Sequence, residues 1–439
     1  MSPASAIPDK TIAGRDYIFA TLLGMLIAGF HYFNGYPLAR SVLLQSFNWA
    51  FDFDSSRFVK AWTVPDVDVS DVHPVSFVAR HALSLAIRPL GLGLNMVIGD
   101  SYLAVMALTA LCAGCVTVIA YILAAQLCEN RFDRFLMAAA YSFSAQPLML
   151  GINPEVYGFA LAGIGLHMVM VVNRRGLPPS VTGWSVVGFV INAGVTVTNA
   201  VLNIVASAVL AWRRVSLWTW ITIEFKTGIF AAIGLALVVV PLAALFEPSV
   251  LADAPSAPKR VWWIININRA EPASLLAVIA ALVPFGFVAP EFTMVDLPKD
   301  GHSMLDFREF RYGLGGAISI AAWIVAMIVG AYVSLRDEGL RRILGVVLIW
   351  TSLNILLHWY WQFRGSVYLY GAHTSFPLFI LLIVAYAGAL RKYSPIITRV
   401  VATATLSIAA LNNVSLYRQM IDYIVSQPPV PEQMRTPRK

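Results

Sequence analysis

The segment SYLAVMALTALCAGCVTVIAYILAAQL, from Ser101 to Leu127, contains no Asp, Glu, Lys or Arg. A helix needs about 20 consecutive apolar residues to cross the hydrocarbon core of a bilayer, and this segment exceeds that length. In lipid, only helices and closed barrels satisfy all their backbone hydrogen bonds. The segment therefore predicts a membrane-spanning helix.

Apolar segments of similar length recur along nearly the whole chain. Of its 439 residues, 58% are hydrophobic and 13% are charged, against about 25% charged in an ordinary soluble domain. We predict an all-α polytopic membrane protein, residues 1–439 forming one domain with about eleven transmembrane helices. The predicted spans are approximately 17–36, 101–127, 135–151, 156–172, 183–197, 199–212, 227–246, 313–334, 342–362, 374–390 and 396–415.

Lys and Arg in short loops indicate the sidedness, because such loops favour the cytoplasm. With the amino terminus inside, every basic cluster falls on the cytoplasmic side. These clusters are Lys10/Arg15, Arg131/Arg134, Arg174/Arg175, Arg213/Arg214/Lys226, Arg336/Arg341/Arg342 and Arg391/Lys392/Arg399. The net charge of +7 is explained by these anchors, so nucleic acid is not a predicted partner.

This orientation predicts two large extracytoplasmic regions, residues 37–100 and 247–312, and an extracytoplasmic tail, residues 416–439. Counting His73 to Ile98 as a span would invert every later loop, so we expect juxtamembrane helices there, at the outer interface. By the same argument, residues 274–290 are expected to be interfacial or re-entrant. The prolines near the carboxyl end predict a disordered terminus.

The first outer region gathers charge in Phe51-Asp52-Phe53-Asp54-Ser55-Ser56-Arg57. Asp52 and Asp54 share one face of an extended segment, whereas Asp54 and Arg57 would meet on a helix. Either arrangement keeps a carboxylate ionised beside a cation, which is the state that a general base needs. The alternative interpretation is a solvated polar loop.

Several outer cations are candidates for binding a phosphate, because Arg holds phosphate oxygens bidentately and cations neutralise a leaving phosphate. The alternative is ordinary contact with lipid headgroups. The candidate phosphate-binding residues are Arg57, Lys60, Arg80 and Arg364.

A late outer turn, from His358 to His373, is rich in aromatic side chains. An interfacial belt of Trp and Tyr explains such a turn, and a sugar or phosphate pocket is the alternative. Its candidate pocket residues are His358, Tyr368, Tyr370 and His373. A divalent metal held by Asp54, His358 and His373 is the one cofactor considered, and no close ligand spacing supports it.

The order of these features resembles the GT-C superfamily of integral-membrane glycosyltransferases, which includes protein O-mannosyltransferases and aminoarabinose transferases. The matching features are Asp52 or Asp54 in the first outer loop, His73-Pro74, the basic inner turn Asn130 to Arg134, the outer turn Asn153-Pro154-Glu155-Val156-Tyr157, and the aromatic turn from Tyr368 to Pro377. The first loop carries a single His-Pro where many relatives have a fuller element, so the subfamily and the acceptor stay unassigned.

The resemblance implies an inverting transferase that uses a polyprenyl-phosphate-linked sugar in a membrane lipid environment. It implies Asp54, or else Asp52, as the general base, with His73 and Glu155 joining the substrate pocket. The acceptor would be a hydroxyl of a glycan, lipid or protein on the extracytoplasmic side. A bacterial inner membrane, with the site facing the periplasm or cell exterior, suits the compact loops.

Two other functions remain open. An O-antigen polymerase or ligase would rely on outer Arg and His side chains rather than on a carboxylate. A lipid or solute transporter would need a polar pathway within the membrane. The few polar candidates are interpreted as helix contacts or helix ends: Asn192, Asn199, Asn203, Asn354 and Glu224.

Overall fold

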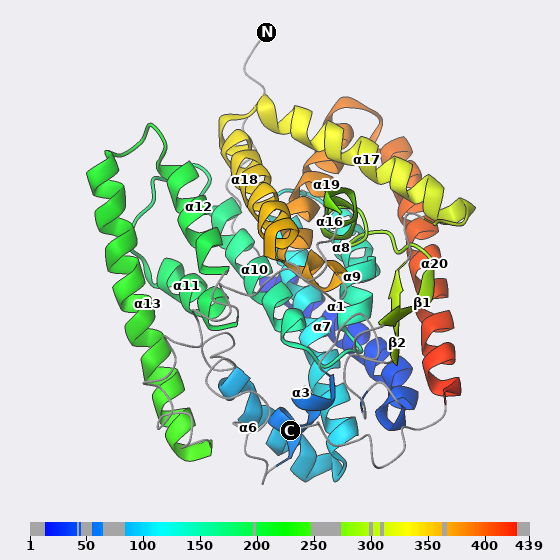
Figure 1. Cartoon of the computed structure of the whole chain (residues 1–439). Helices are drawn as coiled ribbons and strands as arrows, with labels where there is room; N and C mark the ends of the chain where they lie inside the picture. The colour runs from blue at the N-terminus through cyan, green and yellow to red at the C-terminus, as the bar shows by residue number, and fades with distance from the viewer. Residues whose placement is uncertain are drawn as a thin grey trace.

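The computed structural model describes residues 14–41, 44, 55–64, 84–195, 199–246, 274–297, 302–307, 311–361 and 367–427, and helices dominate these ranges (Figure 1). The α-helices are α1 (Gly14–Gly35), α3 (Ser55–Thr63), α6 (Ser84–Ile98), α7 (Ser101–Ala125), α8 (Arg131–Ser142), α9 (Ala145–Leu150), α10 (Val156–Asn173), α11 (Gly183–Val195), α12 (Ala200–Ala211), α13 (Leu217–Phe246), α16 (Leu275–Leu282), α17 (Leu314–Leu335), α18 (Glu338–Trp361), α19 (Ala372–Lys392) and α20 (Pro395–Ser426). The 3-10 helices are η1 (Tyr36–Arg40) and η4 (Val367–Gly371).

Within the described ranges, eight helices are long and apolar enough to cross a membrane, judged by length and composition. They are α1, α7, α10, α13, α17, α18, α19 and α20, and each coincides with one of the predicted spans. The prediction of a polytopic, all-helical membrane protein is confirmed at this level, whereas the count of about eleven spans stays a prediction.

The other three predicted spans correspond to shorter helices. Residues 135–151 divide into α8 and α9, and the break falls at Phe143 and Ser144. At this break the backbone finds partners outside its own helix: Asn413 donates to the Phe143 carbonyl at 3.0 Å, and Gln146 N–H donates to the Gly286 carbonyl at 2.9 Å. Helices α11 and α12 have only 13 and 12 residues.

Helices α7 and α19 form the centre of the molecule. Helix α7 packs against α1, α8 and α10, and α19 packs against α10, α17, α18 and α20. In the most apolar stretches of α7 and α19, 67% and 78% of the residues are buried. The corresponding share is 11% in α13 and in α20, which lie at opposite edges of the molecule in Figure 1. The edge helices therefore present their apolar side chains to lipid.

The predicted inner loops meet at one end of the molecule, which we call the basic end. Arg134 pairs with the buried Asp16 of α1 at 2.8 Å, and Arg399 of α20 pairs with Asp133 of α8 at 2.9 Å. These ion pairs join the amino ends of α1, α8 and α20.

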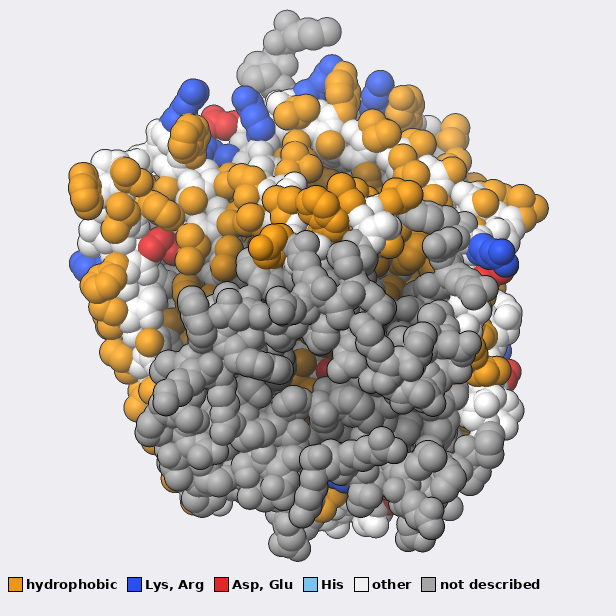
Figure 2. Space-filling model, in the orientation of Figure 1, with side chains coloured by type: hydrophobic (Ala, Val, Ile, Leu, Met, Phe, Trp, Pro, Cys, Tyr) orange, Lys and Arg blue, Asp and Glu red, His pale blue; other side chains and the backbone are white. Residues whose placement is uncertain are grey.

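Other inner loops make contacts at the basic end through backbone carbonyls. Arg214 donates to the Leu177 carbonyl at 2.9 Å, and Arg342 donates to the Trp212 carbonyl at 2.9 Å. Figure 2 shows Lys and Arg side chains gathered along the upper edge of the molecule, where α17 and α18 meet in Figure 1. The grouping agrees with the predicted sidedness, although the orientation itself stays a prediction.

The predicted first outer region, residues 37–100, contains the helices α3 and α6 among its described residues, and their location at the membrane surface stays a prediction. Arg88 of α6 donates to the Ala61 carbonyl at 2.8 Å, and Asn95 donates to the Thr63 carbonyl at 2.8 Å. These two side chains bind carbonyl groups at the carboxyl end of α3, which have no partners within the helix. They hold α3 and α6 together.

The second outer region has a short helix and a hairpin. Helix α16 covers only eight residues, so residues 274–290 do not form a membrane-length helix. The segment that follows α16 is attached to α20 by Asn413, whose Oδ1 accepts a hydrogen bond from Ala289 N–H at 2.9 Å. Strands β1 (Phe292–Leu297) and β2 (His302–Phe307) then pair antiparallel, Phe292 opposite Phe307, which adds a small sheet to the helical fold.

Two helices differ in length from their predicted spans. Helix α20 continues to Ser426, because Tyr417, Met420, Ile421 and Ile424 recur at helical spacing and are buried. The predicted tail, residues 416–439, therefore begins as part of this helix. Helix α13 begins at Leu217, ten residues before the predicted span, and so includes Glu224 and Lys226.

Candidate functional site

Four aromatic rings from α10, α18, η4 and α19 meet at the end opposite the basic end, which we call the outer end. The centroids of His358 and Tyr370 lie 4.0 Å apart with near-parallel planes, and that of His373 lies 6.0 Å from His358. Tyr157 stands perpendicular to the other rings, 5.5 Å from Tyr370 and 5.7 Å from His373. We call these four residues the outer-end cluster.

The outer-end cluster combines buried histidines with half-buried tyrosines. His358 and His373 are 9% and 3% exposed, whereas Tyr157 and Tyr370 are half-buried. The structure thus brings together three predicted pocket residues and adds Tyr157, which lies two residues after Glu155. The tyrosines are the members that retain exposed ring surface.

The turn between η4 and α19 is fixed by hydrogen bonds to neighbouring elements. Trp350 of α18 donates its indole N–H to the His373 carbonyl at 2.6 Å, and the Thr374 hydroxyl donates to the Leu282 carbonyl. At Gly371 an added Cβ would lie 2.9 Å from Gln146 Oε1, so the backbone approaches α9 closely. These contacts hold the His373 backbone in place at the amino end of α19.

Glu155 and Tyr368 are placed beside this cluster with structural roles of their own. Glu155 is 4% exposed and caps α10, accepting a hydrogen bond from Val156 N–H at 3.1 Å. A carboxylate at this position also interacts favourably with the helix dipole. Burial raises the pKa of the Tyr368 phenol well above its usual range, so Tyr368 stays protonated at neutral pH.

Helix α3 packs mainly on α6 and α7 and touches α10 through one ring contact, on a face of α10 other than that of Tyr157. Trp62 of α3 makes an edge contact with Phe159, the ring centroids 5.4 Å apart, and Phe159 lies two residues after Tyr157. Lys60, a predicted phosphate ligand, is half-buried on this helix. In the sequence, Asp54 directly precedes Ser55, the first residue of α3.

The remaining predicted site residues lie outside the described residues: Asp52, Asp54, His73, Arg80 and Arg364, together with the side chain of Arg57. Over the described ranges, no group of three or more His, Cys, Asp or Glu side chains is arranged to hold a metal ion. The site that can be described is therefore the outer-end cluster.

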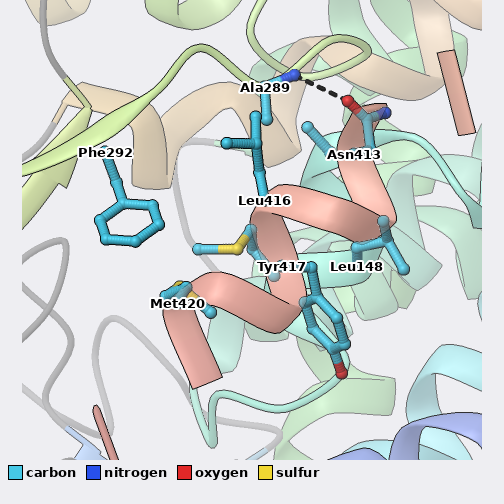
Figure 3. A pocket seen from close by; sticks show the side chains of 9 residues that line it. Leu148, Ala289, Phe292, Asn413, Leu416, Tyr417 and Met420 are labelled. Carbon is cyan, nitrogen blue, oxygen red and sulfur yellow. Dashed lines mark hydrogen bonds between the residues drawn. The ribbon is translucent and has the colours of Figure 1, made fainter. Parts of the chain in front are cut away.

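A small cavity between α9 and α20 is not a substrate site. It has a volume of about 10 Å³ and is lined mainly by apolar side chains such as Leu148, Leu416 and Met420 (Figure 3). Such a volume holds about one water molecule. The Asn413 amide beside it already bonds Ala289 N–H, as Figure 3 also shows, so the region serves packing.

Sequence reasoning assigned no site role to three residues: Tyr157, Trp350 and Gln146. Tyr157 belongs to the outer turn that carries the resemblance, but only Glu155 of that turn was predicted to join the pocket. The contacts of Trp350 and Gln146 depend on how α18 and α9 pack on α19 and η4, which no local pattern contains.

The apolar helices make this a multi-pass integral membrane protein. No protein-family model matches the sequence, and no curated protein matches it.

Proposed function

We propose that the protein is a membrane glycosyltransferase that transfers a sugar from a polyprenyl-phosphate donor to an acceptor hydroxyl at the outer end. The observation that carries the proposal is the outer-end cluster. It is formed by the two outer turns that the GT-C resemblance links, the turn with Glu155 and the turn before α19. Tyr157 and Tyr370 offer ring surface and hydroxyl groups, which suit the apolar face and the hydroxyls of a sugar.

Helix α3 supports the proposal because it follows the predicted base in the sequence and its Trp62 touches Phe159, which lies in the first turns of α10, the helix that also carries Tyr157. In the proposed reaction, Asp54 removes the proton of the acceptor hydroxyl as its oxygen attacks the anomeric carbon. The bond from that carbon to the donor phosphate breaks in the same step, with inversion, and polyprenyl phosphate leaves. Asp52 is the alternative base.

The leaving phosphate carries negative charge at the membrane surface, so cations near it lower the barrier. Lys60 on α3 is the described candidate, and Arg57, Arg80 and Arg364 are the other proposed ligands. The acceptor is a glycan, lipid or protein, and the proposed location is a bacterial inner membrane with the outer end facing the periplasm or cell exterior.

The test uses purified protein in nanodiscs with a panel of radiolabelled polyprenyl-phosphate sugars and envelope extract as acceptor. We expect donor consumption by the wild type and a loss of about a hundredfold or more in Asp54→Asn, as for removal of a general base. Asp68→Asn, which changes another carboxylate of the same outer region, should retain activity. Full activity in both Asp54→Asn and Asp52→Asn would refute the assigned base.

A second candidate function is an O-antigen polymerase or ligase. The two buried histidines of the outer-end cluster favour it, because such an enzyme would rely on His and Arg rather than on a carboxylate. With a lipid-linked oligosaccharide as donor, this candidate predicts that His373→Gln abolishes turnover while Asp54→Asn retains it. The glycosyltransferase proposal predicts that Asp54→Asn causes the larger loss.

A further inference from the structure

A cavity of about 70 Å³ lies between α10, α11, α12 and α13, near the basic end. Arg174 and Ser180 line it at the ends of the helices, and His167 lines it seven residues further along α10. With a rise of 1.5 Å per residue, His167 lies about 10 Å deeper along the helix axis. The cavity is several times larger than one water molecule requires.

Three polar side chains that line the cavity have buried nitrogen or oxygen atoms without a hydrogen-bond partner among the described residues. They are His167, through both ring nitrogens, Asn203, through Oδ1, and Thr227, through its hydroxyl. Their exposed fractions are 8%, 6% and 4%. A buried polar group without a partner is destabilising, and polar groups at membrane depth usually serve a function.

Two of these groups face the same point above Gly188 of α11. An added Cβ on Gly188 would lie 3.1 Å from His167 Nδ1 and 3.7 Å from Asn203 Oδ1. Met170 Cε, which also belongs to a lining residue, lies 2.6 Å from the same position, so its methyl group fills that point and the two polar atoms lie close together beside it. Asn203 was interpreted as a helix contact or helix end, and its Nδ2 does donate to the Asn199 carbonyl at 3.5 Å, whereas its Oδ1 has no partner among the described residues.

A carboxylate completes one wall of the cavity. Glu224 of α13 is half-buried and hydrogen-bonds with the Ser207 hydroxyl, which also accepts a hydrogen bond from Trp220 Nε1 at 3.2 Å. Among the residues that line the cavity, Glu224 is the one acidic side chain and Arg174 the one Arg or Lys. Opposite charges therefore stand at two places in the cavity wall.

We infer that this cavity binds a primary ammonium group attached to a phosphate ester, the chemistry of a phosphoethanolamine headgroup. An ammonium has three N–H donors and no acceptor. The cavity offers it the Glu224 carboxylate, Asn203 Oδ1 and the Thr227 hydroxyl oxygen, and neutral His167 provides a further acceptor nitrogen.

The phosphate of the same headgroup matches Arg174 at the helix ends, since Arg binds phosphate through parallel N–H donors. Arg174 is held there by hydrogen bonds to Ser180 at 2.6 Å and Thr182 at 3.1 Å. A choline headgroup has the same charges but no N–H donor, so it would leave the acceptors unpaired. The ligand has two sources: a lipid that enters past α13, or free phosphoethanolamine from the aqueous side.

Native mass spectrometry of the full chain in detergent tests the inference, with phosphatidylethanolamine, phosphatidylcholine of the same acyl chains, and free phosphoethanolamine as probes. We expect phosphatidylethanolamine to bind at least tenfold more tightly than phosphatidylcholine. Glu224→Gln should remove this preference, and Glu291→Gln, which changes an exposed carboxylate outside the cavity, should retain it. Competition by free phosphoethanolamine indicates the soluble source, and its absence indicates the lipid.

Equal binding of the two lipids by the wild type would overturn the inference, and so would an unchanged preference in Glu224→Gln. If that variant does not fold, Thr227→Val provides the test, because Val keeps the shape of Thr and removes its acceptor. We expect Thr227→Val to weaken phosphatidylethanolamine binding severalfold, and unchanged binding would contradict the site. The result does not depend on glycosyl transfer at the outer end.

Discussion

The ion pair of Asp133 and Arg399 makes a strong prediction about stability. Asp133 is 2% exposed and accepts hydrogen bonds from Arg399 Nε at 2.9 Å, from Arg399 Nη2 at 3.0 Å and from the Tyr386 hydroxyl at 2.6 Å. This one carboxylate therefore joins α8, α19 and α20 at the basic end. Asp133→Asn removes the charge and leaves a single acceptor oxygen for three donors.

The expected loss of unfolding free energy in Asp133→Asn depends on how buried the ion pair is and on how well water reaches Arg399. Breaking a buried ion pair by removing one partner destabilises by about 3 to 5 kcal/mol. Because the Arg399 side chain is 31% exposed, water compensates part of that loss, and we expect about 2 to 3 kcal/mol for Asp133→Asn. Most of this expected loss comes from the Arg399 guanidinium, which is left without its carboxylate partner.

Equilibrium unfolding in mixed detergent micelles measures this loss. The control is Glu338→Gln, which removes a carboxylate that is 71% exposed and pairs with Arg342 at 3.0 Å, and should lower the free energy of unfolding far less than Asp133→Asn does, because water screens an exposed pair. Equal losses in the two variants would refute the reasoning. Adding Arg399→Gln to Asp133→Asn should cost little more, since the two residues act as a pair.

Three further predictions concern packing, the outer-end cluster and a buried thiol. Gly91→Ala should destabilise by about 1 to 3 kcal/mol in a thermal scan, because its Cβ would lie 2.3 Å from the Trp62 carbonyl oxygen, whereas Gly93→Ala has open space and should be neutral. Tyr370→Leu should raise the KM for the sugar donor severalfold in the turnover assay, through loss of a half-buried aromatic ring, and an unchanged KM would place the sugar elsewhere. Burial raises the pKa of the Cys128 thiol from 9.0 to about 12, so the folded state keeps a proton that the unfolded state loses. Stability should therefore fall as pH rises from about 9 to 12, and Cys128→Ala should reduce that fall in a pH series of unfolding measurements.

The sequence predicted the membrane-length helices well, because their signal is local. A long uncharged run such as Ser101 to Leu127 leaves little choice of structure in lipid. The positions of Arg134 and Arg399 also predicted that their loops lie at one end, and the structure joins both loops through buried carboxylates. Neither carboxylate partner, Asp16 nor Asp133, was predicted.

Helix breaks and helix ends were harder to predict. The break between α8 and α9 is stabilised by Asn413 and by Gly286, which lie far away in the sequence. The continuation of α20 had a local signal in the helical spacing of Tyr417 and Ile424. The prolines further along the sequence instead led to the prediction of a disordered terminus. Boundaries of this kind depend on tertiary packing more than on hydropathy.

The candidate site was predictable in part. The histidines and Tyr370 stand close together in the sequence, so their grouping followed from one aromatic turn. Tyr157 joins them from another helix, and its packing on His373 depends on how α10 and α19 meet. The polar cavity of α10 to α13 was not predicted, because His167, Asn203 and Glu224 come from three separate helices.

The decisive measurement for the proposed function is release of polyprenyl phosphate by the purified wild-type protein in nanodiscs. The donors would be polyprenyl-phosphate-linked monosaccharides, with envelope extract as acceptor and empty nanodiscs as the blank. We predict release above the blank with at least one donor and transfer of its sugar to an acceptor with inverted anomeric configuration. No release with any donor would contradict the proposed glycosyltransferase activity.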